Sequence, residues 1–250
     1  MFGRNKNKQK TVEIFWTGGF DSTFRVCQLS RFPVTIKPYY LSDDRKSEEL
    51  ELGAIDTVTE LIRNRPDALC YLRDVVVIPK DQRSEDKSIN EAYKRIRKTH
   101  HLGTQYQWLG WFAKTHRGIE LSVVGGDHAI ELIEERGAFI RNDDPLIGES
   151  YIVDKRRTQK DVTRIFRDFS FPLRNTTKVE MHDEYERLGF GDVIELTWFC
   201  HRPIEGRPCG QCNPCKSYIE GDLPREFPPE MLERYARMME EKAEESQISP

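Results

Sequence analysis

The chain has 250 residues, enough for one large core, and its 39 basic and 42 acidic residues give a net charge of −3. A protein that binds nucleic acid through its overall charge would be basic throughout, and this balance excludes that class. No apolar run approaches the roughly 20 residues of a membrane span, so we expect a cytoplasmic protein without membrane contact. Residues 1–10 are basic and lack an apolar signal core, which predicts a disordered tail.

The first element ends in a glycine motif. The apolar, β-prone residues 12–16 stop at a Gly-Gly pair, and hydroxyl and acidic residues then open a predicted helix over residues 21–30. A strand, a glycine turn and a helix N-terminus together form a layout that holds anions, above all phosphates. Gly18 and Gly19 allow a sharp turn, and Asp21 can hold Mg²⁺. The hydroxyl donors are Thr17, Ser22 and Thr23. A plain turn before a capped helix is the alternative, because short glycine motifs are not specific.

Strands and helices alternate through the first half of the chain. The predicted strands are residues 12–16, 34–41, 75–79 and 121–125, and the predicted helices are 21–30, 46–64, 89–98 and 103–116. The third strand is a continuous β-branched run, typical of strands buried on both faces of a parallel sheet. This alternation predicts an α/β fold, a doubly wound parallel sheet with helices on both faces. Ligands bind such sheets at the carboxyl ends of the strands, so residues 17–23, 39–44 and 125–128 should converge.

The second half is less regular. Residues 147–153 predict a strand and residues 161–169 a helix, and Asn175 or Thr176 should cap a further helix that runs to about residue 188. Lys178 in the first turn of that helix opposes the helix dipole unless an anion is near. It is therefore a candidate phosphate contact, with a solvent-facing lysine as the alternative. Residues 228–245 predict an amphipathic helix that packs on the body or, as the minority view, on a second copy in a homodimer.

Four of the six cysteines crowd into a short segment with the spacing C-x8-C-x2-C-x2-C. They are Cys200, Cys209, Cys212 and Cys215. Such spacing is typical of a tetrahedral thiolate site in a reducing compartment, not of a disulfide framework. Four ligands leave no open position for water or substrate, so we predict a structural Zn²⁺. A redox dithiol or an iron–sulfur cluster is the alternative.

Together these motifs resemble one family. Thr17-Gly18-Gly19-Phe20-Asp21-Ser22-Thr23 resembles the S-G-G-x-D-S/T loop of the PP-loop ATP pyrophosphatases. Residues 197–215 with the four cysteines, and residues 172–180 before them, are similar to the zinc end of the 7-cyano-7-deazaguanine (preQ0) synthases. The resemblance spans roughly residues 12–220 and is a specific combination. It implies a Rossmann-like fold of the adenine nucleotide alpha hydrolase type. The implied segments are a tail (1–10), a nucleotide-binding domain (11–195), a zinc-binding helical segment (196–220) and a C-terminal helix and tail (221–250).

The resemblance also implies an activity. The chain would be an ATP-dependent carbon–nitrogen ligase that adenylates a carboxylate such as 7-carboxy-7-deazaguanine, releases pyrophosphate and couples the acid to an amine. The implied cofactors are ATP, Mg²⁺ and structural Zn²⁺. Asp21 and Lys178 would be catalytic. The nucleotide would be bound by Thr17, Gly18, Gly19, Phe20, Asp21, Ser22, Thr23, Tyr39, Tyr40, Leu41 and Gly125.

One departure leaves the acceptor open. The G-Y-P-D-C-R segment that usually follows the fourth strand in this family is absent, and residues 125–131 read Gly-Gly-Asp-His-Ala-Ile-Glu instead. The amine is therefore either ammonia or a larger acceptor, a protein or a nucleic acid. A different pocket would draw on Trp108, Trp111, Arg117 and His128. Further alternatives are another PP-loop chemistry such as tRNA thiolation, with Cys70 as its thiol, and a nucleotide-binding scaffold without catalysis.

Overall fold

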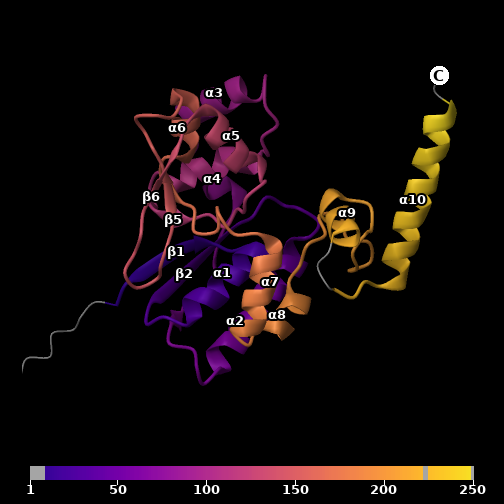
Figure 1. Cartoon of the computed structure of the whole chain (residues 1–250), viewed down its shortest axis with the longest axis horizontal. Coiled ribbons are helices and arrows are strands. Elements are labelled where there is room, and N and C mark those ends of the chain that lie inside the picture. Colours follow the sequence, from indigo (N-terminus) through magenta and orange to yellow (C-terminus); the bar gives the residue numbers. More distant parts are fainter. Residues whose placement is uncertain (1–8, 222–224, 249–250) are drawn as a thin grey trace, which may run out of the picture.

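A parallel sheet lies at the centre of the computed structural model, which describes residues 9–221 and 225–248 (Figure 1). Its strands are β1 (Thr11–Phe15), β2 (Thr35–Leu41), β3 (Tyr71–Leu72), β4 (Val76–Ile78), β5 (Ile119–Glu120) and β8 (Phe169–Ser170). The strand order is β3-β2-β1-β5-β8, β4 also pairs with β2, and every pair is parallel. The predicted α/β fold with a doubly wound parallel sheet is therefore confirmed. The tail predicted at the N-terminus lies mostly outside the described residues, at positions 1–8.

Helices cover both faces of the sheet. One face carries α1 (Phe20–Ser30), α2 (Glu48–Asn64), α7 (Lys178–Arg187) and α8 (Gly191–Leu196). The other carries α3 (Lys87–Ile96), α4 (Gln105–Ala113), α5 (His128–Arg136) and α6 (Lys160–Phe166), which form the upper lobe in Figure 1. Side chains alternate along the central strand: Ile14 and Trp16 enter the first core, and Phe15 enters the second. This period of two is what a strand buried on both faces requires.

The remaining elements lie outside the sheet. They are the 3₁₀ turn η1 (Lys80–Gln82), the antiparallel hairpin of β6 (Phe139–Arg141) and β7 (Tyr151–Val153), α9 (Asn213–Glu220) and α10 (Pro229–Ile248). The first turns of α10 pack on the cysteine segment, where Met231 is buried and Arg234 donates hydrogen bonds to two backbone carbonyls. The hydroxyl of Tyr235 also donates to Glu220 of α9, so α10 packs on the cysteine segment and α9, while it stands away from the central sheet in Figure 1. Homodimer formation stays a prediction. No helix in the described ranges combines the length and apolarity needed to span a bilayer.

Several predicted boundaries are wrong. The predicted strand at residues 121–125 lies two positions too late, because the chain leaves the sheet after Glu120 and the N–H of Val123 bonds back to the carbonyl of Leu121. The predicted helix at residues 161–169 ends earlier, and its last residue belongs to β8. The strand predicted to be buried on both faces is the edge strand β4, where Val76 is 38% exposed.

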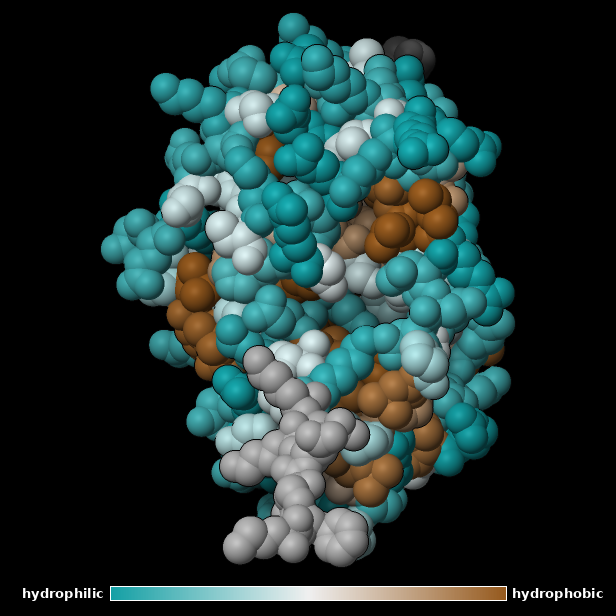
Figure 2. Space-filling view, turned by 90° about the vertical axis from the view of Figure 1, so that its left-hand side faces the viewer, coloured by the Kyte–Doolittle hydropathy of each residue, from teal (hydrophilic) through white to brown (hydrophobic). Residues whose placement is uncertain are grey.

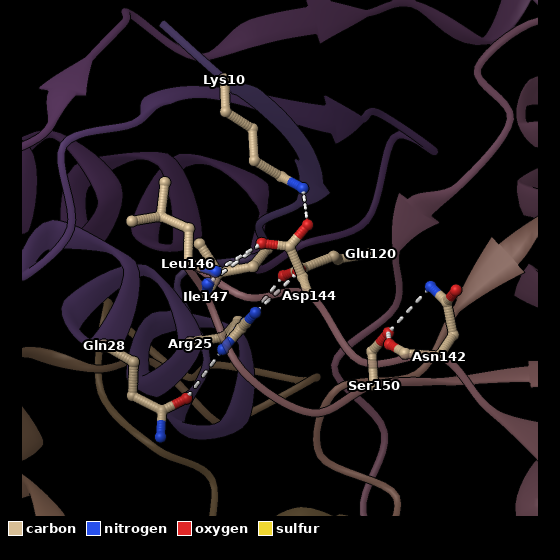
Figure 3. A network of polar contacts seen from close by, with 9 residues as sticks. All are labelled: Lys10, Arg25, Gln28, Glu120, Asn142, Asp144, Leu146, Ile147 and Ser150. Atoms are coloured by element: carbon tan, nitrogen blue, oxygen red, sulfur yellow. Dashed lines mark hydrogen bonds and ion pairs between the residues drawn. The ribbon is translucent and has the colours of Figure 1, made fainter.

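A buried ion pair joins α1 to the sheet (Figure 3). Arg25 donates from Nε and Nη2 to the two carboxylate oxygens of Glu120, each at 2.8 Å, and the two side chains are only 5% and 4% exposed. The turn of the β6–β7 hairpin lies beside this pair in Figure 3, and the backbone N–H groups of Leu146 and Ile147 donate to the side-chain carboxylate of Asp144. Asp144 also pairs with Lys10 at the start of β1. One set of contacts therefore joins α1 to β5, and a separate set joins the residue before β1 to the hairpin turn.

Candidate functional site

The candidate site lies where the strand order reverses. From β1 the chain proceeds outward to β2 and β3, and β5 then pairs on the other side of β1. The loops that follow β1 and β5 therefore run apart and leave a crevice at the carboxyl ends of the strands, the usual ligand site of this fold class. A cavity of about 540 Å³ opens there. Its walls come from the loop after β1, the end of β2, α4, the segment after β5, the start of α7 and the cysteine segment.

The loop after β1 is shaped by its glycines. Gly18 has φ +70°, and a Cβ at this position would lie 2.5 Å from the backbone oxygen of Glu51, so the loop passes α2 only with glycine here. Gly19 is the N-cap of α1. The N–H of Thr17 donates to Oγ of Ser22 at 3.3 Å, which closes the turn on itself. The loop is thus a fixed turn before a helix N-terminus, the arrangement that favours anions.

Asp21 faces this cavity with an unsatisfied oxygen. Its Oδ1 is enclosed and has no hydrogen-bond partner among the described residues. Burial raises the pKa of Asp21 above its ordinary value, Lys178 opposes this rise, and Asp127 adds to it. An enclosed carboxylate oxygen without a partner needs explaining, and a bound cation would supply its partner.

Asp127 brings a second carboxylate to the same place. It caps α5 by accepting the N–H of Ala129 at 2.7 Å, and the hydroxyl of Tyr106 donates to the same oxygen at 2.7 Å. Ser122, which follows β5, also lines the cavity, and its buried Oγ has no partner in the part of the chain described. Two carboxylates and a hydroxyl without a partner among the described residues therefore line the cavity.

Lys178 reaches the cavity from far along the chain. It is the first residue of α7, which Thr177 caps in a capping box with Glu180. The predicted caps Asn175 and Thr176 are therefore wrong by one or two residues, although Lys178 does lie in the first turn of the helix as predicted. The lysine Nζ lies 5.3 Å from the ring centroid of Tyr218. A cation in this first turn opposes the helix dipole, and the nearby carboxylate of Asp21 partly offsets that cost.

The structure brings most of the predicted nucleotide-site residues together. Those on the cavity wall are Thr17, Gly19, Phe20, Asp21, Ser22, Tyr39, Leu41 and Lys178. Gly18, Thr23, Tyr40 and Gly125 are not on the wall. Oγ1 of Thr23 accepts the indole N–H of Trp16 at 2.9 Å, and the hydroxyl of Tyr40 donates to Glu51 at 2.7 Å. The binding and catalytic roles of all these residues stay predictions.

The predicted convergence of residues 17–23, 39–44 and 125–128 is confirmed in part, since Asp43 and Asp127 share the cavity wall with Asp21. Tyr106 and Ser122, which add polar groups to the wall, were missed, because nothing in their local sequence marks them as site residues. Of the four residues considered for a different pocket, Trp108 lines this cavity. Trp111 donates to Asn90 at 2.8 Å, Arg117 lines a separate hollow, and His128 is exposed beside Glu131.

The four cysteines form a cluster that could hold a metal ion. Their sulfur atoms all lie within 4.8 Å of one another, with separations of 3.8 Å (Cys209–Cys215), 4.0 Å (Cys200–Cys212) and 3.4 Å (Cys212–Cys215). A tetrahedral zinc site with Zn–S bonds of about 2.3 Å has sulfur–sulfur edges of about 3.8 Å. Backbone N–H groups also donate to the sulfurs of Cys200 and Cys209 at 3.2–3.3 Å, which favours thiolates. The donor set therefore fits zinc, and the identity of the metal stays a proposal.

The cysteine segment also forms one wall of the cavity. Trp198, Phe199, His201, Pro214 and Tyr218 line it, and the N–H of Trp198 donates to the carbonyl of Gly18 at 2.9 Å. Folding of this segment around a metal would therefore position the wall that faces the loop after β1.

The two other cysteines lie elsewhere. Cys70 lines a separate hollow with Arg63 and Arg65, and burial raises the pKa of its thiol. Cys27 is fully buried in α1, and burial raises the pKa of its thiol as well. Neither thiol lines the cavity, so the geometry offers no support for sulfur-transfer chemistry there.

Comparison with known proteins adds little. No protein-family model matches the chain, and no curated protein matches it either. Among solved structures, NMN synthetase from Francisella tularensis is 14% identical, with 90% of this chain and 82% of that chain covered and a TM-score of 0.38. Function must therefore be argued from the site itself.

Proposed function

We propose that this chain is an ATP-dependent carbon–nitrogen ligase of the PP-loop type, which adenylates a carboxylate and passes the acyl group to an amine. One observation carries the proposal. Asp21 and Lys178, far apart in the sequence, face a single cavity beside a glycine turn and a helix N-terminus. The resemblance of residues 17–23 to the PP-loop supports the same function.

The chemistry explains why ATP is needed. A carboxylate is a poor acyl donor because oxide would have to leave. Attack of a carboxylate oxygen on the α-phosphorus breaks the bond to the β-phosphate, releases pyrophosphate and forms an acyl-adenylate. The amine nitrogen then attacks the acyl carbon, the bond to AMP breaks, and an amide, AMP and a proton result. Such a reaction requires charge neutralisation and positioning more than covalent catalysis.

The residues divide these tasks. Ser22 and the turn at Gly19 would bind the pyrophosphate at the N-terminus of α1. Lys178 would neutralise phosphate charge as the α–β bond breaks. Asp21 and Asp127 would hold Mg²⁺, since both line the cavity and their carboxylates interact electrostatically.

The second part of the proposal concerns the identity of the carboxylic acid substrate and of the amine. Tyr39 and Trp108 on the cavity wall offer aromatic surfaces to planar heterocycles. The similarity of residues 172–180 and 197–215 to the preQ0 synthases favours a 7-carboxy-7-deazaguanine-like acid. Because the family's substrate segment is replaced at residues 125–131, we propose that the amine is either ammonia or a larger acceptor on a protein or nucleic acid.

Product analysis tests the proposal. The protein, ATP, Mg²⁺ and 7-carboxy-7-deazaguanine should yield AMP and pyrophosphate. Loss of a preorganised charge commonly costs about 10²- to 10³-fold in rate, so Lys178→Ala and Asp21→Ala should each reduce AMP formation to that extent. Lys46→Ala is the matched control, an exposed lysine that is not on the cavity wall.

Three outcomes would count against it. Absence of AMP with this acid, despite ATP binding, would refute the proposed acid. Absence of AMP with a broad panel of carboxylates and amines would indicate a nucleotide-binding scaffold. Full activity of both site variants would show that the chemistry takes place elsewhere.

A further inference from the structure

Basic side chains gather on one outer face of the molecule. Residues 87–98, which contain α3, and residues 155–167, which contain α6, hold eleven Lys and Arg against two Asp and Glu. The two helices pack against each other, so these residues form one surface, the α3–α6 face. The face carries a net charge of +9, although the whole chain carries −3 and the remainder therefore −12.

Most of these cations have no ionic partner. Three of the eleven form ion pairs: Lys94 with Glu91, Arg95 with Asp161, and Arg167 with Asp168. The other eight pair with no acidic group in the residues that the structure describes. They are Lys87, Arg97, Lys98, Lys155, Arg156, Arg157, Lys160 and Arg164. All but Arg164 are exposed, so their charges face solvent.

Two hollows flank α6, and cations line both. A hollow of about 440 Å³ between α3 and α6 has Arg95, Lys160 and Arg164 on its walls. A second, of about 350 Å³, has Arg117, Lys155 and Arg167. Acidic groups are fewer, two in the first hollow and one in the second. Recesses lined by guanidinium and ammonium groups suit phosphate oxygens, which Arg can bind in bidentate fashion.

The types of side chain on the α3–α6 face limit the class of partner that it could bind. Large exposed apolar side chains, which a membrane surface would engage, are absent from residues 87–98 and 155–167. Figure 2 shows the upper part of one side of the molecule, where this lobe lies, to be mostly hydrophilic. The aromatic side chains Tyr93 and Phe166 are 7% and 0% exposed, so neither can stack on bases. A positively charged surface without exposed apolar or aromatic side chains is suited to a phosphate backbone.

We propose that the α3–α6 face binds the phosphate backbone of a nucleic acid with little regard to its sequence. The face lies one helix layer from the cavity, because α4 packs on both α3 and α6 while its Tyr106 and Trp108 line the cavity. A bound nucleic acid would therefore lie close to the candidate site. The proposal rests on surface charge alone and does not depend on the ligase activity.

Fluorescence anisotropy in the absence of ATP tests the proposal. The full chain is titrated against a labelled 30-nucleotide RNA, and against single- and double-stranded DNA of the same sequence. The test variant combines Arg156→Glu, Arg157→Glu and Lys160→Glu. A control variant with the same change in net charge combines Lys46→Glu, Arg73→Glu and Arg237→Glu, three exposed cations outside the face that form no ion pair with a described residue.

The expected results are quantitative. Each phosphate contact contributes about −0.7 to the slope of log K against log salt for single strands, so the test variant should lose about 2 units of slope. Its affinity at about 100 mM salt should fall at least tenfold. The control should stay within about twofold, since it keeps the α3–α6 face. The same substitutions to Gln should give an intermediate loss, with circular dichroism unchanged in all variants.

Four results would overturn the proposal. Two concern affinity: no nucleic-acid binding at about 50 mM salt, or equal losses of affinity in the test and control variants. Two concern the ligand: binding of phosphatidylserine vesicles but not of RNA or DNA, or more than tenfold discrimination between nucleic-acid sequences. A preference among RNA, single-stranded DNA and duplex would identify the source of the phosphates. Because no ATP is present, failure here leaves the proposed ligase activity untouched.

Discussion

The buried pair of Arg25 and Glu120 predicts a large loss of stability when one partner is removed. Both side chains are at most 5% exposed, and two hydrogen bonds of 2.8 Å join them (Figure 3). In Arg25→Met the Glu120 carboxylate would lose both bonds while it stays away from water. Breaking a buried ion pair in this way costs about 3–5 kcal/mol, because the remaining charge is uncompensated. For a chain of this size the loss corresponds to a decrease in Tm of roughly 6–20 °C.

Urea denaturation of four proteins measures this cost. They are the wild type, Arg25→Met, Glu120→Leu and the double variant. The double variant removes both charges and should recover much of the stability, since an apolar pair of similar volume is often as stable as the ion pair. The coupling energy between the two sites should therefore be at least about 2 kcal/mol.

Two controls separate the ion pair from other effects. Gln28→Ala removes only the 3.3 Å bond that Arg25 also donates to Gln28, and should cost less than about 1.5 kcal/mol. Unchanged urea m-values would show that the variants unfold in the same way. A loss below about 1 kcal/mol in Arg25→Met, or a double variant as unstable as the worse single variant, would refute the reasoning.

Three further predictions follow from the site and its support. In Cys212→Ser one thiolate is lost, so elemental analysis should show loss of bound metal. ATP binding should also weaken, because the cavity wall at Trp198 would be less well ordered. Full metal retention, or iron in place of zinc, would contradict the zinc prediction. Gly18→Ala should destabilise the protein by about 2 kcal/mol or more, since φ is +70° and the new Cβ would meet a backbone oxygen at 2.5 Å. The control Gly53→Ala in α2, where an added Cβ would meet no atom within 4 Å apart from its chain neighbours and its own helix backbone, should instead stabilise it by about 0.5–1 kcal/mol. For Asp21 the folded pKa is raised above 3.8, so the unfolded chain ionises first as the pH rises and stability is lost above that value. Asp21→Asn should therefore raise Tm at pH 7, by an amount that shrinks as the pH falls toward 3.8, and an equal shift at every pH would count against a raised pKa of Asp21.

Local features of the fold could be predicted from the sequence. The glycine turn at Gly18, the start of α7 at Lys178 and the four-cysteine cluster depend on conformational freedom, capping or chelation within a few residues. The alternation of segments was also sufficient for the α/β class, because short continuous apolar runs predict buried strands and longer stretches with helical spacing predict amphipathic helices. Errors fell on short elements such as β5 and β8, whose two residues carry no periodic signal.

Only the tertiary structure decided which residues become neighbours of these local features in space. The pairing of β1 with β5 places Asp127 beside Asp21, and that neighbour depends on a strand order that no local pattern specifies. The α3–α6 face is a second case. Its two segments carry net charges of +4 and +5, separated by more than fifty residues in a chain of net −3. Electrostatic potential depends on distance in space, so their sum acts as one surface only after α3 packs on α6.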